Sequence, residues 1–261
     1  MQQLAVVGNP IEHSRSPQIW QQFASECNIE LSYGKIFSPL DDFEHLVSEF
    51  FKNGGLAVNV TAPFKSRAYT LANTHHHDAM IAKSANLLLL KDDLIVAYNT
   101  DGIGLVNDIT RRGFSLADKK ILILGSGSVI HSVIPALEAA KPQCIDLLMR
   151  NWDKLDDFVS VSRLIDEYDP EQAYDIVINT TPNTTDNPLF AQVAVLNDGA
   201  LIYDMIYTAD ETLFMQSMKK VAPSIIAVNG LGMLIEQAAA GFEIVFGIMP
   251  PTAKTYQLLQ G

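Results

Sequence analysis

The segment 119–128, KKILILGSGS, constrains the fold of this chain more strongly than any other. Residues 121–124 form an unbroken apolar run, which is typical of a parallel strand buried on both faces. Gly125 and Gly127 follow this run directly, and the residues after them have the apolar spacing of a helix. A strand, a glycine turn and a helix together direct backbone N–H groups at a pyrophosphate. In the G-x-G-x-x-G/A pattern of such turns, the third small position is occupied here by Ile130. The motif alone is therefore also compatible with an ordinary strand-to-helix turn.

Apolar runs with the length of strands alternate with segments of helical period along the whole chain. The predicted strands are residues 4–7, 31–37, 55–60, 87–90, 94–97, 121–124, 144–149, 174–179, 200–204 and 225–227. The predicted helices are residues 17–27, 40–51, 101–112, 128–140, 231–246 and 251–259. This alternation predicts an α/β fold with parallel sheets and right-handed crossovers, in which residues 87–97 form a hairpin. We place the best domain boundary in the helix after Asp101.

Length and charge limit the partners that this chain can have. Its 261 residues are enough for one large domain or two modest ones, and its formal net charge is −12. This charge disfavours nucleic-acid and anionic membrane surfaces, whereas local basic residues in a cleft can still bind a small anion. No apolar run approaches the about 20 residues of a membrane span, and the N-terminus lacks the pattern of a secretory signal. Cys27 and Cys144 are predicted to be buried free thiols of a cytoplasmic protein.

Three polar clusters follow predicted strands, where open α/β sheets place their sites. The first, GNPIEHSRSP, contains Ser14 and Ser16 just before a helix that starts with a proline. Their hydroxyls can cap the helix or bind an oxoanion. The second, NVTAPFK, brings an amide, a hydroxyl and the amine of Lys65 together. That amine can donate a proton in a cleft, or it can be a surface lysine at a helix start.

The third cluster, NTDG, ends the predicted hairpin. Its Asp101 can accept a hydrogen bond from a substrate hydroxyl, pair with a lysine or cap a helix. Asn86 begins the other arm of the hairpin, so we expect its side chain to face the same space. The consecutive histidines at 75–77 splay to different faces, so we expect a solvated loop there and no metal site.

Taken in order, these clusters resemble the shikimate dehydrogenase family. The matching motifs are GNPIEHSRSP, NVTAPFK, YNTDG and, near the C-terminus, NGLGMLIEQAA, and they extend over nearly the full length. The resemblance implies an N-terminal α/β substrate domain, residues 1–101 together with about 236–261. It also implies a Rossmann-type doubly wound NADP-binding domain, residues 102–235, with the C-terminal helix returning to the first domain. The implied reaction is the reversible reduction of 3-dehydroshikimate to shikimate in aromatic amino-acid (chorismate) biosynthesis, by a monomer or a homodimer.

Carried over residue by residue, the resemblance makes Lys65 and Asp101 the catalytic pair, with Lys65 delivering a proton to the carbonyl oxygen. The residues that would hold the substrate are Ser14, Ser16, Asn59, Thr61, Asn86, Tyr207 and Gln237. The residues that would contact NADP are Gly125, Ser126, Gly127, Ser128, Arg150, Lys154, Asn179, Thr180, Gly230 and Met233. The resemblance implies no metal ligand. From their apolar surroundings alone, Met233 and Gln237 can also be packing positions.

The cofactor side departs from the family pattern. Val129 and Ile130 add branched bulk where the family has small side chains, and His131 replaces a usual arginine or lysine, which removes a fixed charge at neutral pH. Arg150 is retained after the next strand, where it suits an adenosine 2′-phosphate and favours NADP over NAD. Lys154 replaces a second usual arginine and lacks its bidentate fork.

The substrate side departs at one segment, KSANL, which retains Asn86 of the family's GAVNT but loses the glycine and the threonine. Two alternatives to shikimate dehydrogenase follow from these departures. One is a binding protein that keeps the substrate pocket and has lost the dinucleotide. The other is a dehydrogenase that acts on quinate or another hydroxylated ring acid.

Overall fold

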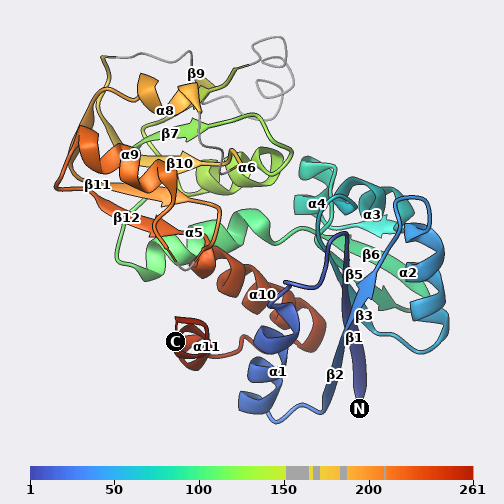
Figure 1. The fold of residues 1–261 in the computed structure, drawn as a ribbon. Helices are drawn as coiled ribbons and strands as arrows, with labels where there is room; N and C mark the ends of the chain where they lie inside the picture. The colour runs from blue at the N-terminus through green and yellow to red at the C-terminus, as the bar shows by residue number, and fades with distance from the viewer. Residues whose placement is uncertain (151–164, 167–170, 183–186, 209, 261) are drawn as a thin grey trace. The chain divides into compact units, whose positions relative to one another are not determined.

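The computed structural model describes residues 1–150, 165–166, 171–182, 187–208 and 210–260 (Figure 1). The chain forms two compact units, unit 1 with residues 1–104 and 235–261, and unit 2 with residues 105–234. It passes from unit 1 to unit 2 within helix α5 (Asp101–Arg111) and returns within helix α10 (Leu231–Phe246). Each helix in the described part of the chain is too short or too polar to cross a membrane.

Unit 1 is built on a six-stranded sheet with the order β2-β1-β3-β5-β6-β4. Its strands are β1 (Gln2–Gly8), β2 (Leu31–Phe37), β3 (Ala57–Val60), β4 (Thr74–His75), β5 (Leu87–Lys91) and β6 (Leu94–Tyr98). β1 is parallel to both β2 and β3, whereas β5 is antiparallel to β3 and to β6. The β5–β6 hairpin agrees with the prediction, and it makes this sheet mixed where the alternation of elements predicted parallel sheets.

Amphipathic helices bury their apolar stripes against this sheet and against one another. Besides α5 and α10, the helices of unit 1 are α1 (Ser16–Glu26), α2 (Phe43–Lys52), α3 (Lys65–Leu71), α4 (His77–Ala82) and α11 (Ala253–Gln260). Phe242 of α10 contacts Trp20 and Phe23 of α1, with ring centroids 5.6 and 5.8 Å apart, and α11 packs on α1. The C-terminal helices therefore return to the unit that contains the N-terminus, as predicted.

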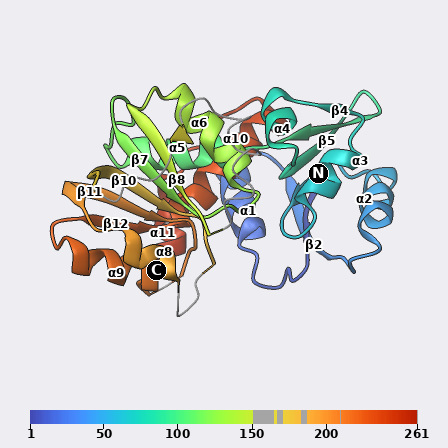
Figure 2. The ribbon, with the colours of Figure 1, turned by 90° about the horizontal axis from the view of Figure 1, so that it is seen from above.

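Unit 2 contains a second six-stranded sheet, in which all recorded pairings are parallel and the order is β12-β11-β10-β7-β8-β9 (Figure 2). Its strands are β7 (Lys120–Leu124), β8 (Cys144–Leu148), β9 (Ile165–Asp166), β10 (Tyr174–Asn179), β11 (Leu196–Asp204) and β12 (Ile226–Asn229). Its described helices, besides parts of α5 and α10, are α6 (Ile130–Ala139), α8 (Pro188–Gln192) and α9 (Leu213–Val221). Counted from β7 and read from the other edge, the strand order is 3-2-1-4-5-6, that of the doubly wound dinucleotide-binding fold.

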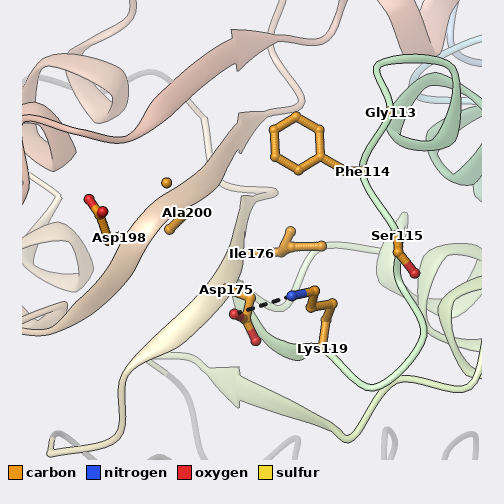
Figure 3. Close-up of a pocket in the computed structure, with 9 residues that line it drawn as sticks. Gly113, Phe114, Ser115, Lys119, Asp175, Ile176, Asp198 and Ala200 are labelled. Atoms are coloured by element: carbon orange, nitrogen blue, oxygen red, sulfur yellow. Dashed lines mark ion pairs between the residues drawn. The ribbon is translucent and has the colours of Figure 1, made fainter.

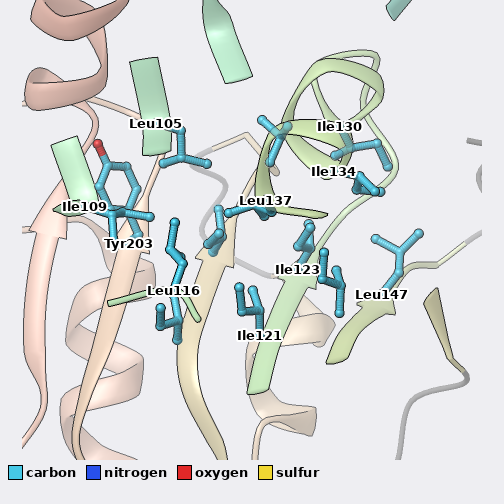
Figure 4. Packing of buried hydrophobic residues seen from close by; sticks show 14 of the residues in the cluster. Leu105, Ile109, Leu116, Ile121, Ile123, Ile130, Ile134, Leu137, Leu147 and Tyr203 are labelled. Atoms are coloured by element: carbon cyan, nitrogen blue, oxygen red, sulfur yellow. The ribbon is translucent and has the colours of Figure 1, made fainter. Parts of the chain in front are cut away.

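The apolar run of β7 explains why it lies at the centre of this sheet. Ile121 and Ile123 are fully buried on one face, in a cluster with Ile130 and Ile134 of α6 (Figure 4). Leu122 and Leu124 are buried in the cluster on the other face. Because successive side chains of a strand point to opposite faces, an unbroken apolar run needs a core on each side, and unit 2 provides both.

The structure contains short helices that the sequence pattern did not predict. α3 has seven residues, α4 six, α8 five and α9 nine. Apolar periodicity identifies a helix only over a window of about 11–18 residues, so elements of this length give too little signal. Two details also differ from prediction: Cys27 and Cys144 are free but only half-buried, and the histidines at 75–77 span the end of β4 and the start of α4.

A cavity of about 300 Å³ lies at the amino-terminal ends of β7, β10 and β11, opposite the strand ends that carry the glycine turn (Figure 3). Two of its charged residues, Lys119 and Asp175, are paired within the protein. Lys119 Nζ lies 3.7 Å from Asp175 Oδ1, and Asp175 also accepts hydrogen bonds from Asn197 Nδ2 (3.0 Å) and from the backbone N–H of Lys120 (2.9 Å). These contacts connect the amino-terminal ends of β7, β10 and β11.

Candidate active site

The antiparallel part of the unit 1 sheet brings distant polar residues to one edge. Asn59 pairs with Leu87 across β3 and β5, and Leu87 pairs with Tyr98 across β5 and β6. Because β5 runs opposite to its neighbours, the residue before it lies beside the residues that follow β3 and β6. Asn86 thus lies next to the carboxyl ends of β3 and β6, and its backbone carbonyl accepts a hydrogen bond from Val60 N at 2.9 Å.

Lys65 and Asp101 form an ion pair at this edge. Lys65 is the first residue of α3 and Asp101 is the first residue of α5, and Lys65 Nζ lies 2.7 Å from Asp101 Oδ2. The side chain of Asp101 is 8% exposed, whereas that of Lys65 is 31% exposed. Lys65 thus lies at a helix start, as expected of a surface lysine, but its amine contacts the buried carboxylate of Asp101. The pair can exchange a proton with a bound molecule on the open side of Lys65.

Asn86 and Gln237 extend this pair into a hydrogen-bonded network. Asn86 Nδ2 lies 2.9 Å from Asp101 Oδ1, 2.9 Å from Thr100 Oγ1 and 3.1 Å from Gln237 Oε1. Its Oδ1 accepts from the backbone N–H of Thr100 at 2.9 Å, and Thr100 Oγ1 donates to the backbone carbonyl of Gln237 at 2.9 Å. Since Asn86 is 3% exposed, these contacts hold Asp101 in one orientation. Thr100, which the sequence offered only as part of a motif, therefore supports the network.

Asn59 has a partner that sequence reasoning missed. Tyr33 of β2 donates its hydroxyl to Asn59 Oδ1 at 2.7 Å, and Asn59 Nδ2 donates to the carbonyl of Asn86 at 3.4 Å. Tyr33 is 7% exposed. Burial raises the pKa of its phenol well above the ordinary value, although a hydrogen bond with the Ser16 side chain acts in the opposite direction. Tyr33 lies in β2, outside the three polar clusters, so no motif or spacing in the sequence identifies it as part of this site.

Ser14, Ser16 and Thr61 are half-buried in unit 1, at the carboxyl ends of β1 and β3. Ser14 Oγ accepts from the backbone N–H of Ser16 at 3.3 Å, which orders the entry into α1. Thr61 N donates to the carbonyl of Val7 at 3.0 Å, so its backbone is held against β1. Tyr207 belongs to unit 2, where it follows β11 and is 40% exposed.

The glycine turn of unit 2 depends on the backbone of Gly125. This residue has φ +108°, and a Cβ there would lie 2.7 Å from both Thr180 Oγ1 and Thr181 Cγ2. Ser126 is half-buried, and Gly127 and Ser128 are exposed between β7 and α6. The turn therefore presents backbone groups at the start of a helix, at the switch point between β7 and β10.

The branched residues after the turn do not fill it. Ile130 is fully buried in the cluster that also contains Ile123 and Leu147, and Val129 packs against the same cluster (Figure 4). The bulk that departs from the family pattern therefore lies in the hydrophobic core, and Gly125 and Gly127 remain the residues that form the turn.

Asn179 and Thr180 end β10 beside the glycine turn. Asn179 is fully buried, its Nδ2 donates to Asp204 Oδ1 at 3.1 Å, and its Oδ1 accepts from Thr181 N at 3.0 Å. Thr180 Oγ1 donates to the carbonyl of Leu124 at 2.8 Å. These bonds hold the Asn179 and Thr180 side chains in place beside the glycine turn.

Gly230 and Met233, expected beside the nicotinamide, also have roles within the protein. A Cβ at Gly230 would lie 2.2 Å from the carbonyl oxygen of Met205, so only glycine fits there. Met233 is 7% exposed in the hydrophobic core, and its backbone N–H donates to the Tyr203 hydroxyl at 3.1 Å. The Met233 side chain thus occupies the packing position that its apolar surroundings suggested. Arg150 is exposed after β8, and Lys154 lies outside the described residues.

Comparison with known proteins gives consistent similarities. The models for the shikimate dehydrogenase substrate binding domain and the shikimate 5′-dehydrogenase C-terminal domain match residues 6–88 and 230–260. A shikimate dehydrogenase (NADP(+)) of Vesicomyosocius okutanii is 36% identical, with 100% of both chains covered. Another from Methylobacillus flagellatus is 38% identical and covers 100% of this chain and 99% of its own. The crystal structure of an Ael1 enzyme from Pseudomonas putida superposes with a TM-score of 0.91 at 35% identity, covering 100% of this chain and 99% of that one.

Proposed function

We propose that this chain, which belongs to the shikimate dehydrogenase family, catalyses the reversible, NADP-dependent reduction of 3-dehydroshikimate to shikimate. The observation that carries the proposal is the Lys65–Asp101 pair, with 2.7 Å between Nζ and Oδ2, inside a network of amide side chains at one sheet edge. A proton donor beside hydrogen-bonding groups suits a small ring that carries hydroxyls and one carbonyl.

Substrate binding is assigned to side chains of unit 1 and to Tyr207. Ser14 and Ser16 precede and begin α1, where their hydroxyls and nearby N–H groups suit the carboxylate of the ring. Asn59, Thr61, Asn86 and Gln237 offer amide and hydroxyl groups for the ring hydroxyls. The family motif also assigns Tyr207, which follows β11, to the substrate. This division follows the proposed roles of unit 1 as substrate domain and unit 2 as dinucleotide-binding domain.

The proton moves through Lys65. In the direction of reduction, Lys65 Nζ donates a proton to the carbonyl oxygen of the substrate, and in the reverse direction it accepts the hydroxyl proton. Asp101 Oδ2 lies 2.7 Å from Nζ and directs the amine, while Asn86 holds the other carboxylate oxygen. Because the carboxylate is buried and hydrogen-bonded, it keeps Lys65 in place while the amine itself remains partly open.

The strand order and turn of unit 2 fit a dinucleotide. The sheet has the order of the dinucleotide-binding fold, and Gly125 adopts a backbone conformation that brings Thr180 close to the turn. The turn 125–128 would hold the pyrophosphate, Thr180 would border it, and Arg150 would bind the 2′-phosphate of the adenosine. When bound, NADPH supplies the hydride. The Ile130 side chain lies in the core and not in the turn, so its bulk does not argue for a silent binding protein.

A turnover assay tests the function. Purified protein is mixed with shikimate and NADP+, and NADPH is followed by its absorbance; quinate replaces shikimate in one arm, and NAD+ replaces NADP+ in another. We expect the highest kcat/KM with shikimate and NADP+. Shikimate binding by calorimetry without turnover under any condition contradicts the proposal in favour of a binding protein, and a higher kcat/KM with quinate contradicts the assigned substrate.

The location that fits this chemistry is the cytoplasm. Cys27 and Cys144 are both free thiols, as expected in a reducing compartment that also holds NADPH.

A further inference from the structure

The orientation of the Asn59 side chain depends on a residue outside every motif. Asn59 Oδ1 accepts the hydroxyl of Tyr33 at 2.7 Å, and Asn59 Nδ2 faces the carbonyl of Asn86 at 3.4 Å. If the amide were reversed, its oxygen would face that carbonyl, and two acceptors would oppose each other. The carbonyl of Asn86 therefore sets which end of the amide faces it, and the Tyr33 hydroxyl donates to the oxygen end and holds it in place.

The position of Tyr33 makes this contact rigid. β1 pairs Leu4 with Tyr33 on one side and Val6 with Asn59 on the other, so both side chains leave the same face of the sheet and meet across β1. The Tyr33 ring contacts Trp20, which is fully buried, with ring centroids 5.6 Å apart. A ring held in this way keeps its hydroxyl at one point.

The same hydroxyl lies near a second group of the proposed substrate site. The Ser16 side chain, at the start of α1, acts to lower the pKa of the Tyr33 phenol, in opposition to burial. The bond that carries the inference is the one at 2.7 Å between the Tyr33 hydroxyl and Asn59 Oδ1, because Asn59 is the residue assigned to a ring hydroxyl.

We propose that Tyr33 is a positioning residue of the substrate site: its hydroxyl holds the amide of Asn59 in the position from which that amide can bind a hydroxyl of the substrate ring. This inference rests on the proposed function, because it concerns the same site. It assigns Tyr33 no contact with the substrate and no role in proton transfer.

The test removes one oxygen atom. Tyr33→Phe keeps the ring and its contact with Trp20, so we expect KM for shikimate to rise about fivefold to tenfold while kcat and KM for NADP+ stay within about twofold. The matched control is Tyr174→Phe in unit 2, whose hydroxyl also donates to a buried side-chain oxygen, the carboxylate Oδ2 of Asp146, at 2.7 Å. This control should leave KM for shikimate unchanged.

A double-mutant cycle separates positioning from general loss of stability. In an Asn59→Ala background, Tyr33→Phe should raise KM by less than twofold, because the group that it positions is absent. An unchanged KM in Tyr33→Phe, or an equal rise with and without Asn59, overturns the inference. If wild type shows no turnover, the proposed function fails first, and shikimate titrations of the same four proteins by calorimetry decide the Tyr33 inference by the same comparison. Absence of shikimate binding to wild type overturns both.

Discussion

The two units differ in the groups that lie at the carboxyl ends of their strands. In unit 1, the strand ends are surrounded by side chains that bind one another, from Lys65 and Asp101 to Asn86 and Gln237. In unit 2, the corresponding position is a turn of small residues, and Asn179, at the end of β10, is buried with its hydrogen bonds made within the protein. Under the proposed function, unit 1 would bind its ligand mainly with side chains, whereas the turn of unit 2 would do so with backbone groups.

This difference predicts that the two units respond differently to substitution. A side-chain network loses a partner with every change, and an unsatisfied buried group destabilises the whole cluster. A backbone site tolerates a change such as Ile130 when the new side chain points into the core. The following experiments test the contrast between the two units, beginning with the largest effect.

Replacement of Lys65 should have the largest effect. Lys65→Met removes the proton donor and keeps most of the aliphatic stem, so we expect kcat to fall about 10²–10⁴-fold with a much smaller change in KM for shikimate. The measurement is steady-state kinetics with circular dichroism as a check of folding. Lys52→Met, which removes an exposed amine that pairs with Glu49, is the control and should retain full activity. A kcat within tenfold of wild type would assign the proton transfer to another group.

Replacement of Arg150 should alter the preference between the two dinucleotides. Arg150→Ala removes the cation assigned to the 2′-phosphate, so KM for NADP+ should rise about tenfold to a hundredfold while KM for NAD+ changes little. Lys220→Ala, on the exposed surface of α9 in the same unit, controls for the loss of one positive charge. Equal effects on both dinucleotides would contradict the assignment of Arg150.

Two glycines of unit 2 allow the backbone site to be tested with its own control. Gly125 and Gly113 both have positive φ, +108° and +86°, but a Cβ would meet Thr180 and Thr181 only at Gly125. Gly113→Ala should cost about 1–2 kcal/mol of unfolding free energy from the backbone alone. Gly125→Ala should cost about 1–3 kcal/mol more, because the neighbours must move, and it should also weaken NADP+ binding. Urea unfolding and dinucleotide titration of both variants measure the difference. Equal losses would show that close approach to Thr180 is unimportant.

The smallest effect concerns Asp204, the buried acceptor beneath Asn179. Burial raises the pKa of Asp204 above its ordinary value of 3.8, so the folded protein binds this proton more tightly than the unfolded chain. Its contribution to stability is present below that ordinary value and is lost as pH rises through the raised pKa. Asp204→Asn cannot ionise, so its unfolding free energy should gain on that of wild type across the same pH window. Urea unfolding over a series of pH values measures this difference, and a difference that is independent of pH contradicts it.

Sequence reasoning succeeded where a signal extends over several residues. The apolar run before Gly125 gave the central strand of unit 2, and the order of the polar clusters gave the edge where Lys65 and Asp101 meet. It failed where the decisive fact is a single contact. Tyr33 lies in an ordinary strand, and only the pairing of β1 with both β2 and β3 brings it to Asn59. Likewise, no pattern indicates that Ile130 points into the core and away from the turn.

The division of unit 1 between the two ends of the chain has a consequence for how the protein is made. Unit 2 is one continuous stretch, so during synthesis it can fold as soon as its own residues have been added. Unit 1 is completed later, because the partners of Trp20 and Thr100 on α10 are Phe242 and Gln237. Until α10 has been synthesised, α1 lacks the apolar contact with Phe242, and Thr100 lacks the carbonyl of Gln237. The polar network near Asp101 is therefore complete only after α10 has been added.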